Sequence, residues 1–119
     1  MRDIYHQLVK STPDFKNFTD EALAESSDLY SAGAFAINSA LTLIGNLAFD
    51  AINAEDYSDE DARRDLILVS HALRHLPRMA QALNQSSDAA DYVRTQRNKA
   101  GEQSVSYTHL RAHETAANL

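Results

Sequence analysis

The longest uncharged segment of the chain runs from Leu29 to Phe49 and reads LYSAGAFAINSALTLIGNLAF. Between Asp28 and Asp50 there is neither an ionisable Asp, Glu, Lys, Arg or His nor a proline. Apolar or small residues recur here at alternating intervals of four and three, which places them on one stripe of an α-helix. They are Leu23, Ser27, Tyr30, Ala34, Ile37, Leu41, Ile44, Ala48 and Ala51. The pattern predicts one helix over residues 20–53, with Thr19 as its N-cap.

Other apolar side chains lie off this stripe, so the predicted helix is apolar around much of its circumference. A helix of this kind belongs at the centre of a fold. Gly33 and Gly45 favour close approach of a neighbouring backbone, and they are also places where the helix could bend. The off-stripe residues are Phe35, Ala36, Leu43, Leu47, Phe49 and Ile52.

A second long helix is predicted over residues 59–84, with Ser58 as its N-cap. Pro77 lies inside it and predicts a kink. The polar stretch Asn84–Ser87 predicts a break, and a short helix from Asp88 to Lys99 would follow and end at Gly101. The predicted apolar stripe of the second helix is Ala62, Leu66, Val69, Leu73, Leu76, Ala80 and Leu83.

The chain before the first long helix predicts a short amphipathic helix that ends near Lys10. Pro13 interrupts it, and Phe15 and Phe18 are expected to pack onto the domain. The predicted fold is therefore all-α, a small helical bundle built on a long antiparallel hairpin of residues 20–53 and 59–84. Residues 1–103 form its single domain, a size that fits a 119-residue chain.

The short flanking helices are too small to cover all of the central helix. The simplest further cover is a second copy of the same helix, which predicts a homodimer or, failing that, a helical protein partner. The expected interaction surface is Phe35, Leu43, Leu47 and Phe49. In the alternative, kinks and the Phe15/Phe18 segment complete the core of a monomer.

The uncharged segment is also long enough to span a membrane. Polar residues such as Asn38 and Asn46 oppose that interpretation, and the flanks are acidic where a cytoplasmic anchor would be basic. Asn38 could instead fix the register of a helix pair. The first ten residues lack the apolar core of a secretory signal, and the chain has no cysteine. We expect a cytoplasmic protein with no membrane partner.

The net charge of −6 gives no general attraction to nucleic acid. The predicted second helix nevertheless carries a basic face, which could dock a nucleic acid or an acidic partner. A solvent-exposed face with local ion pairs, such as Asp61 with Arg64, is the more ordinary interpretation. The residues of this basic face are Arg64, His71, Arg74, His75 and Arg78.

His71 and His75 are four residues apart and would provide half of a metal site. A third ligand and the glutamate of a zinc-peptidase helix are lacking, and Arg74 and Arg78 oppose a bound cation. We find no nucleophile–base set and no phosphate loop. The sequence therefore predicts no metal, no cofactor and no catalytic residue, and it favours a non-enzymatic interaction or regulatory protein, with a nucleic-acid-associated regulator as the alternative.

The end of the chain differs in character from the rest. Val105 to Thr115, VSYTHLRAHET, resembles the in-frame translation of a transposase-type sequencing adapter over eleven consecutive residues. The resemblance implies that residues 104–119 are a non-native, disordered tail from metagenomic reads, and that the native end was lost after about Gln103. The remainder is similar only in general character to small bacterial and prophage accessory proteins, and that likeness carries no functional residue.

Overall fold

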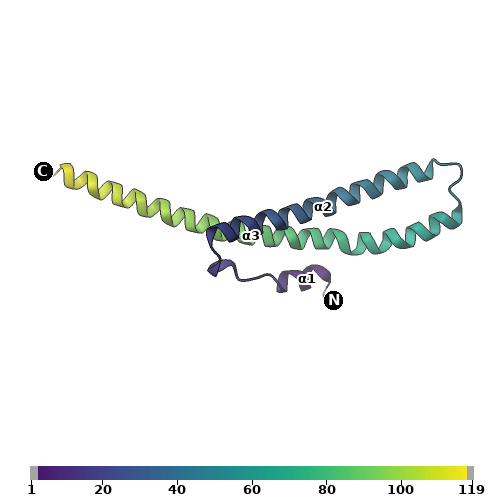
Figure 1. Cartoon of the computed structure of the whole chain (residues 1–119), viewed down its shortest axis with the longest axis horizontal. Coiled ribbons are helices and arrows are strands. Elements are labelled where there is room, and N and C mark those ends of the chain that lie inside the picture. The colour runs from purple at the N-terminus through teal and green to yellow at the C-terminus, as the bar shows by residue number, and fades with distance from the viewer. Residues whose placement is uncertain (1–2, 118–119) are drawn as a thin grey trace.

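A computed structural model describes the backbone of residues 3–117 and the side chains of residues 3–101. The elements are helix α1 (Ile4–Lys10), the 3-10 turn η1 (Phe15–Asn17), helix α2 (Asp20–Ile52) and helix α3 (Asp59–Ala117). All regular structure in the described backbone is helical, so the all-α prediction is confirmed. Figure 1 shows α2 and α3 side by side and running in opposite directions, with α3 continuing well past the start of α2.

The helices begin where the sequence provides side-chain caps. The Thr19 hydroxyl accepts a hydrogen bond from the Ala22 amide at 3.1 Å, and Asp20 and Glu21 follow in the first turn of α2. The Ser58 hydroxyl accepts one from the Asp61 amide at 3.0 Å at the start of α3. Each cap satisfies an amide that has no partner within its helix. Both predicted N-caps are confirmed.

The predicted stripe of α3 is wrong at two positions. Leu66 is 68% exposed and Leu73 is 56% exposed, so neither faces α2. The preceding residues Asp65 and Ala72 are half-buried instead. One residue turns a helix by about 100°, and stripes with three–four spacing can be drawn through either pair. The sequence-based stripe selected the two leucines, whereas the fold turns the smaller Asp65 and Ala72 toward α2.

The predicted break at Asn84–Ser87 and the separate helix after it are also wrong, because α3 is continuous from Asp59 to Ala117. Ser86 and Ser87 are buried in this region. The Ser87 hydroxyl lies 3.2 Å from that of Ser27 and donates to the Ser27 carbonyl at 3.1 Å, while the Ser86 hydroxyl lies 3.1 Å from that of Thr12. The serines therefore join α3 to α2 and to the connector after α1 by hydrogen bonds, and they do not form a loop.

The helix also passes Pro77 and Gly101 without ending, and the backbone is helical through most of the segment expected to be disordered. No proline occurs after Pro77 that would break it. Whether residues 104–119 derive from an adapter remains a prediction from the sequence. The bends expected at Gly33, Gly45 and Pro77 remain predictions as well.

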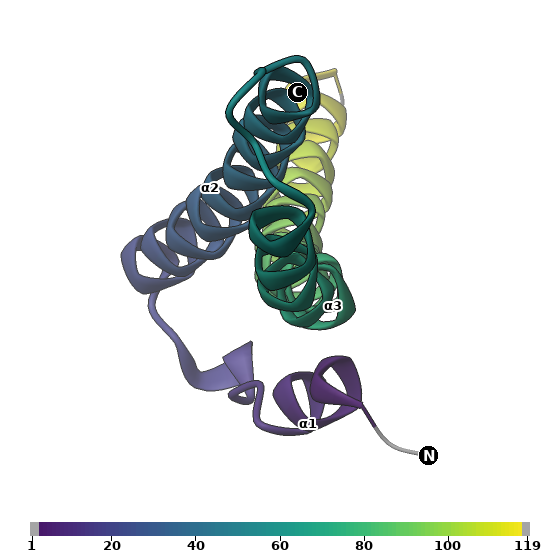
Figure 2. The same cartoon turned by 90° about the vertical axis from the view of Figure 1, so that its right-hand side faces the viewer.

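The N-terminal segment packs against α3, and Figure 2 shows α1 on the far side of α3 from α2. Phe15 is buried and forms a cluster with Leu23 and Ala90, against which Phe18, Tyr30 and Val93 also pack. The prediction that Phe15 and Phe18 pack onto the domain is confirmed. This cluster lies at the end of the α2–α3 pair where α2 begins, far from the loop that joins the helices.

The molecule is elongated, with principal extents of 89 × 31 × 21 Å and a radius of gyration of 23.9 Å. A globular chain of this length would have a radius of gyration of about 13.5 Å. The buried apolar residues are few and mostly alanines: Phe15, Leu23, Ala34, Ala80, Ala82 and Ala90. Most of the large apolar side chains are consequently left outside this core.

Candidate functional site

The most distinctive surface is the exposed apolar part of α2. Phe35 is 74% exposed, Leu43 57%, Leu47 58% and Phe49 69%. A single chain therefore leaves all four residues of the predicted interaction surface uncovered. Leu29 and Ile52 extend the exposed apolar surface toward both ends of the uncharged segment.

Helical periodicity arranges these residues in lines. Phe35 and Phe49 are fourteen residues apart, about four turns, so they share one line along α2. Leu29 and Leu43 have the same spacing and share a second line. Between these lines runs a third of smaller, exposed residues, namely Ala32, Ser39 and Asn46. We call these three lines together the outer face of α2.

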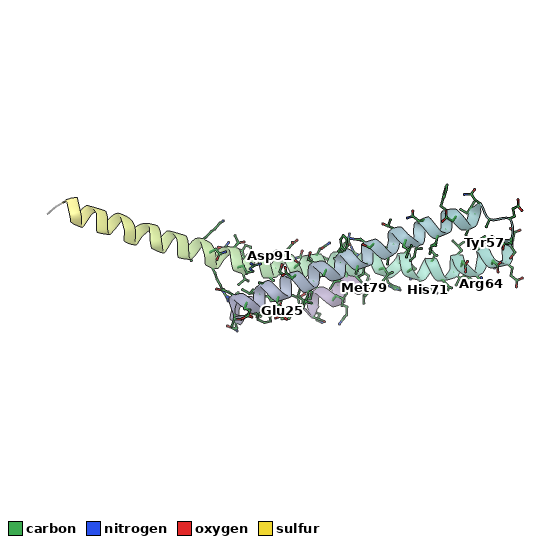
Figure 3. All side chains as sticks on the ribbon, turned by 45° about the horizontal axis from the view of Figure 1, so that its top comes forward. Glu25, Tyr57, Arg64, His71, Met79 and Asp91 are labelled. Carbon is green, nitrogen blue, oxygen red and sulfur yellow. The ribbon has the colours of Figure 1, made fainter. Side chains whose placement is uncertain are left out.

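Helix α3 adds exposed apolar residues near the same end of the molecule, namely Leu66, Ile67, Leu68 and Leu73. A groove of about 230 Å³ lies between the two helices there, with Leu47 and Leu68 among its lining residues. Figure 3 shows the side chains that project from both helices along the half of the molecule that ends at Tyr57. The exposed apolar surface therefore extends from α2 onto α3.

One hydrogen bond ties the joining loop to this groove. The Tyr57 hydroxyl donates to a carboxylate oxygen of Asp65 at 2.7 Å, and both residues line the groove. This hydrogen bond is the main reason why the pKa of Tyr57 lies above its usual value of 10.0, and desolvation raises it further. The polar lining is thus already paired, which leaves the groove as a site for apolar contact.

The predicted basic face is interrupted by ion pairs within the chain. Arg78 binds Asp3 at 2.6 Å, and its guanidinium lies 4.5 Å from the centre of the Tyr5 ring. Arg64 lies 3.3 Å from Asp61 and 3.4 Å from Asp65, and the predicted Asp61–Arg64 pair is confirmed. The remaining residues of the face, His71, Arg74 and His75, are exposed. The structure therefore places all five residues on α3. Carboxylates of the same chain bind two of the three arginines, Arg64 and Arg78.

The pairing of Asp3 with Arg78 also fixes their charge states. The hydrogen bond from Arg78 lowers the pKa of the Asp3 carboxyl below its usual 3.8, and the same bond raises the pKa of Arg78. Asp3 additionally caps α1, because its carboxylate accepts a hydrogen bond from the His6 amide at 3.2 Å. Arg78 thus holds the N-terminal segment on α3.

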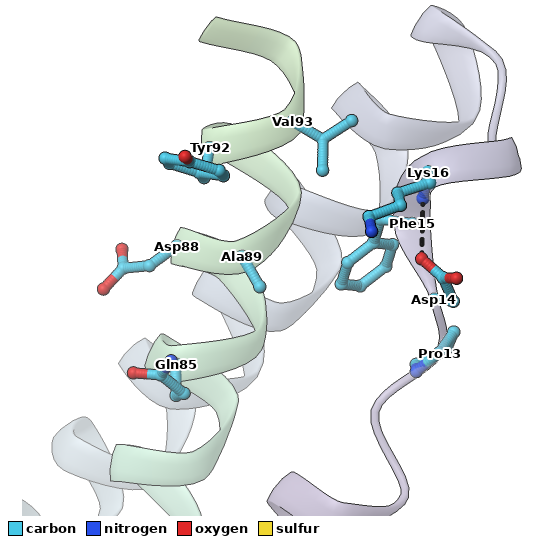
Figure 4. Close-up of a pocket in the computed structure, with 9 residues that line it drawn as sticks. All are labelled: Pro13, Asp14, Phe15, Lys16, Gln85, Asp88, Ala89, Tyr92 and Val93. Carbon is cyan, nitrogen blue, oxygen red and sulfur yellow. Dashed lines mark hydrogen bonds between the residues drawn. The ribbon is translucent and has the colours of Figure 1, made fainter. Parts of the chain in front are cut away.

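A second cleft, of about 560 Å³, lies where η1 meets α3, and the sequence patterns gave no sign of it. Figure 4 shows Phe15 and Pro13 on one side and Ala89, Tyr92 and Val93 on the other. The Asp14 carboxylate accepts a hydrogen bond from the Lys16 amide at 3.1 Å and so serves the turn itself. Tyr92 is exposed at the rim of this cleft.

Among the described side chains, no group of three or more His, Cys, Asp and Glu residues is placed to hold a metal ion. His71 and His75 therefore remain an isolated pair in the part of the chain that the structure describes.

By length and composition, α2 could cross a membrane, and only 6% of its most apolar window is buried. The expected cytoplasmic location and the expected lack of a membrane partner therefore remain predictions. Comparison with protein-family models, with curated proteins and with solved structures finds no significant match to this chain. The candidate site is accordingly defined by its own residues.

Proposed function

We propose that this protein is a non-enzymatic helical interaction protein that self-associates through the outer face of α2. The observation that carries the proposal is the exposure of Phe35, Leu43 and Phe49, with Leu47 exposed beside this face, on a helix without a charged residue between Asp28 and Asp50. Large contiguous apolar patches on a protein surface mark contact sites, because leaving them in water is unfavourable.

The attached helix α3 favours a protein partner over lipid. It lies against α2 and carries Arg63, Arg64, Arg74 and Arg78 in the part that pairs with the uncharged segment. A charged residue at the centre of a bilayer costs about 2.5–3.5 kcal/mol even on favourable scales. Moving α2 into lipid would thus either carry these arginines with it or separate α2 from α3.

The basic face of α3 supports the alternative, a nucleic-acid-associated regulator, less well. Arg64 and Arg78 are the two ends of that face, and both are engaged by carboxylates of the same chain. Contacts to phosphates would have to displace those carboxylates, and the net charge of −6 opposes the approach of a polyanion.

The test compares two leucines of matched exposure. Leu43 on α2 is 57% exposed and Leu73 on α3 is 56% exposed, so a Glu at either position is compatible with the folded monomer. Burial of Leu43 in both copies of a dimer contributes about 2 kcal/mol per copy, so Leu43→Glu should weaken the dimer by about a hundredfold or more. Leu73→Glu is the control and should leave the dimer constant within a few fold.

Sedimentation equilibrium on the full chain and both variants measures these constants, with circular dichroism as the check on folding. A dimer that Leu43→Glu does not weaken, or that only Leu73→Glu disrupts, would contradict the assignment of this surface to α2.

A further inference from the structure

The outer face of α2 has an internal symmetry that specifies how a second copy would bind. We infer that two copies pair through this face in an antiparallel arrangement, with the twofold axis passing beside Ser39. This inference rests on the proposed self-association and adds its direction and register.

The uncharged segment is centred on Ser39. Leu29 and Phe49 are each ten residues from it, and Phe35 and Leu43 are each four residues from it. In an antiparallel pair about a twofold axis, residues at equal distances on opposite sides of the axis lie at the same level in the two copies. Each large residue of the outer face therefore shares its level with a large residue on the opposite edge of the other copy's face. The aspartates that bound the segment are each eleven residues away, at its two ends.

The sizes of the residues on the two edges of the face are also complementary. The twofold axis of an antiparallel pair is perpendicular to both helices, and rotation about it keeps each edge of the face on the same side of the dimer. The Phe35 line of one copy therefore contacts the Phe35 line of the other. Phe35 then lies within one residue of the level of Thr42 of the partner subunit. On the opposite edge, Leu43 lies within one residue of the level of Ala36 of the partner subunit. Near the axis, large side chains thus meet small ones, as close packing of two helices requires. At the ends of the face, Phe49 and Leu29 lie within one residue of the level of Asp28 and Asp50 of the partner subunit, respectively.

The middle line of the face allows the helices to approach. Ala32 and Ser39 are small and exposed, and Asn46 completes the line with a hydrogen-bonding side chain. In the antiparallel register, Asn46 shares its level with Ala32 of the partner subunit. Small residues along a helix–helix contact allow a distance between the two helix axes at the short end of the usual range of about 8–10 Å.

Charge at the loop end disfavours the parallel direction, although the antiparallel one sets each loop near the level of Glu21 and Glu25 of the partner subunit. The loop and the start of α3 are strongly acidic, with Glu55, Asp56, Asp59, Glu60 and Asp61 close together. A parallel pair would bring both of these acidic ends together at one end of the dimer. The antiparallel pair separates them by the length of the uncharged segment, about 30 Å at 1.5 Å per residue, well beyond the screening length of roughly 8 Å.

The buried area is adequate for such a dimer. Four large residues, each more than half exposed, and the smaller residues between them would bury on the order of 600 Å² per copy. That corresponds to about 1,200 Å² in total, the lower end of the range for specific interfaces. The proposal therefore needs no further contact from α3.

The experiment uses single-cysteine variants, because the chain has no cysteine of its own. Full-length Ala32→Cys and a tagged Asn46→Cys are mixed, oxidised under mild conditions and resolved by mass. The antiparallel register predicts efficient disulfides between Ala32→Cys and Asn46→Cys, and between two Ser39→Cys chains. It predicts at least a tenfold lower yield for Ala32→Cys alone, because its two cysteines would lie about 21 Å apart, beyond the Cα separation of less than about 7 Å that a disulfide spans.

Ser70→Cys, at an exposed position on α3, is the matched control and should not cross-link. Efficient disulfides within Ala32→Cys alone and within Asn46→Cys alone would establish a parallel pair and overturn the inference while leaving self-association intact. A wild-type chain that sediments as a monomer, or that instead binds to phosphatidylcholine vesicles, would overturn both this inference and the proposed function.

Discussion

Gly33 and Gly45 both lie inside α2, but their surroundings differ. A Cβ atom at Gly33 would lie 3.2 Å from a methyl carbon of Leu83, whereas nothing lies within 4 Å of one at Gly45. Gly33 therefore lets α2 and α3 approach closely, and Gly45 has no such role within one chain. Each glycine lowers helix stability by about 1 kcal/mol relative to alanine.

Gly45→Ala should therefore stabilise the protein by about 0.5–1 kcal/mol, because it restricts the unfolded chain without creating a clash. Gly33→Ala should gain less, since Leu83 has to shift by a few tenths of an ångström to admit the new methyl group. Thermal unfolding at one fixed protein concentration measures both variants. Equal gains would show that α2 and α3 are not in close contact at Gly33.

The Asp3–Arg78 pair predicts a pH dependence for the docking of α1. The pKa of Asp3 lies below 3.8 in the folded state, so the pair stabilises the docked state above about pH 3.8. That stabilisation is lost as the pH falls through the lower, folded-state pKa. Protection of the α1 amides, relative to their intrinsic exchange rates at each pH, should accordingly fall at pH values below 3.8 while that of the middle of α2 changes less.

The control for this pH dependence is Arg78→Gln, which removes the main cause of the lowered pKa. In that variant, the loss of α1 docking should move up toward the ordinary range of an aspartate near pH 3.8. An unchanged pH profile would mean that Arg78 does not hold Asp3 in solution.

At the scale of the elements, the sequence predicted what depends on local chemistry. The caps at Thr19 and Ser58 and the length of α2 follow from side chains within a few residues of each feature. The continuity of α3 does not follow from local chemistry. Ser86 and Ser87 are typical of a loop, and only their distant partners Thr12 and Ser27 show that they lie in a packed helix. A buried hydrogen-bonded serine and a serine in a turn cannot be distinguished without the distant partner.

The candidate site also combines features that follow from local sequence with features that depend on distant residues. The exposed positions Phe35, Leu43, Leu47 and Phe49 could be predicted because helical periodicity places them off the stripe that faces α3. That periodicity can be read from the sequence alone. The rotation of α3, which exposes Leu66 and Leu73, could not be predicted, since the stripe through Asp65 and Ala72 shares its other positions with the predicted one and is the less apolar of the two. The engagement of Arg78 by Asp3 is equally non-local, because the two residues are 75 positions apart.

The continuity of α3 leads to a prediction for hydrogen exchange. The amides of residues 84–87 should exchange slowly, like those of the helix on either side, because they lie in a helix whose serine side chains are buried and paired. The amides of the joining loop around Glu55 serve as the fast-exchanging reference. Exchange at residues 84–87 as fast as that of the loop would contradict a continuous helix.

At the scale of the whole molecule, the shape follows from the distribution of apolar residues. The small core clusters around Phe15, Leu23 and Ala90 at one end, and most of the large exposed residues occupy the other half of the pair of helices. One end of the molecule is thus closed by its own N-terminal segment. The other end has no equivalent cover within the described chain, and a second copy would provide it.

The most direct test of this account is the mass of the wild-type protein in solution. Sedimentation equilibrium at tens of micromolar should give a species of twice the 13.2 kDa chain mass that dissociates on dilution. A single 13.2 kDa species at every concentration, with α2 still helical by circular dichroism, would contradict the claim that a second copy covers the outer face of α2.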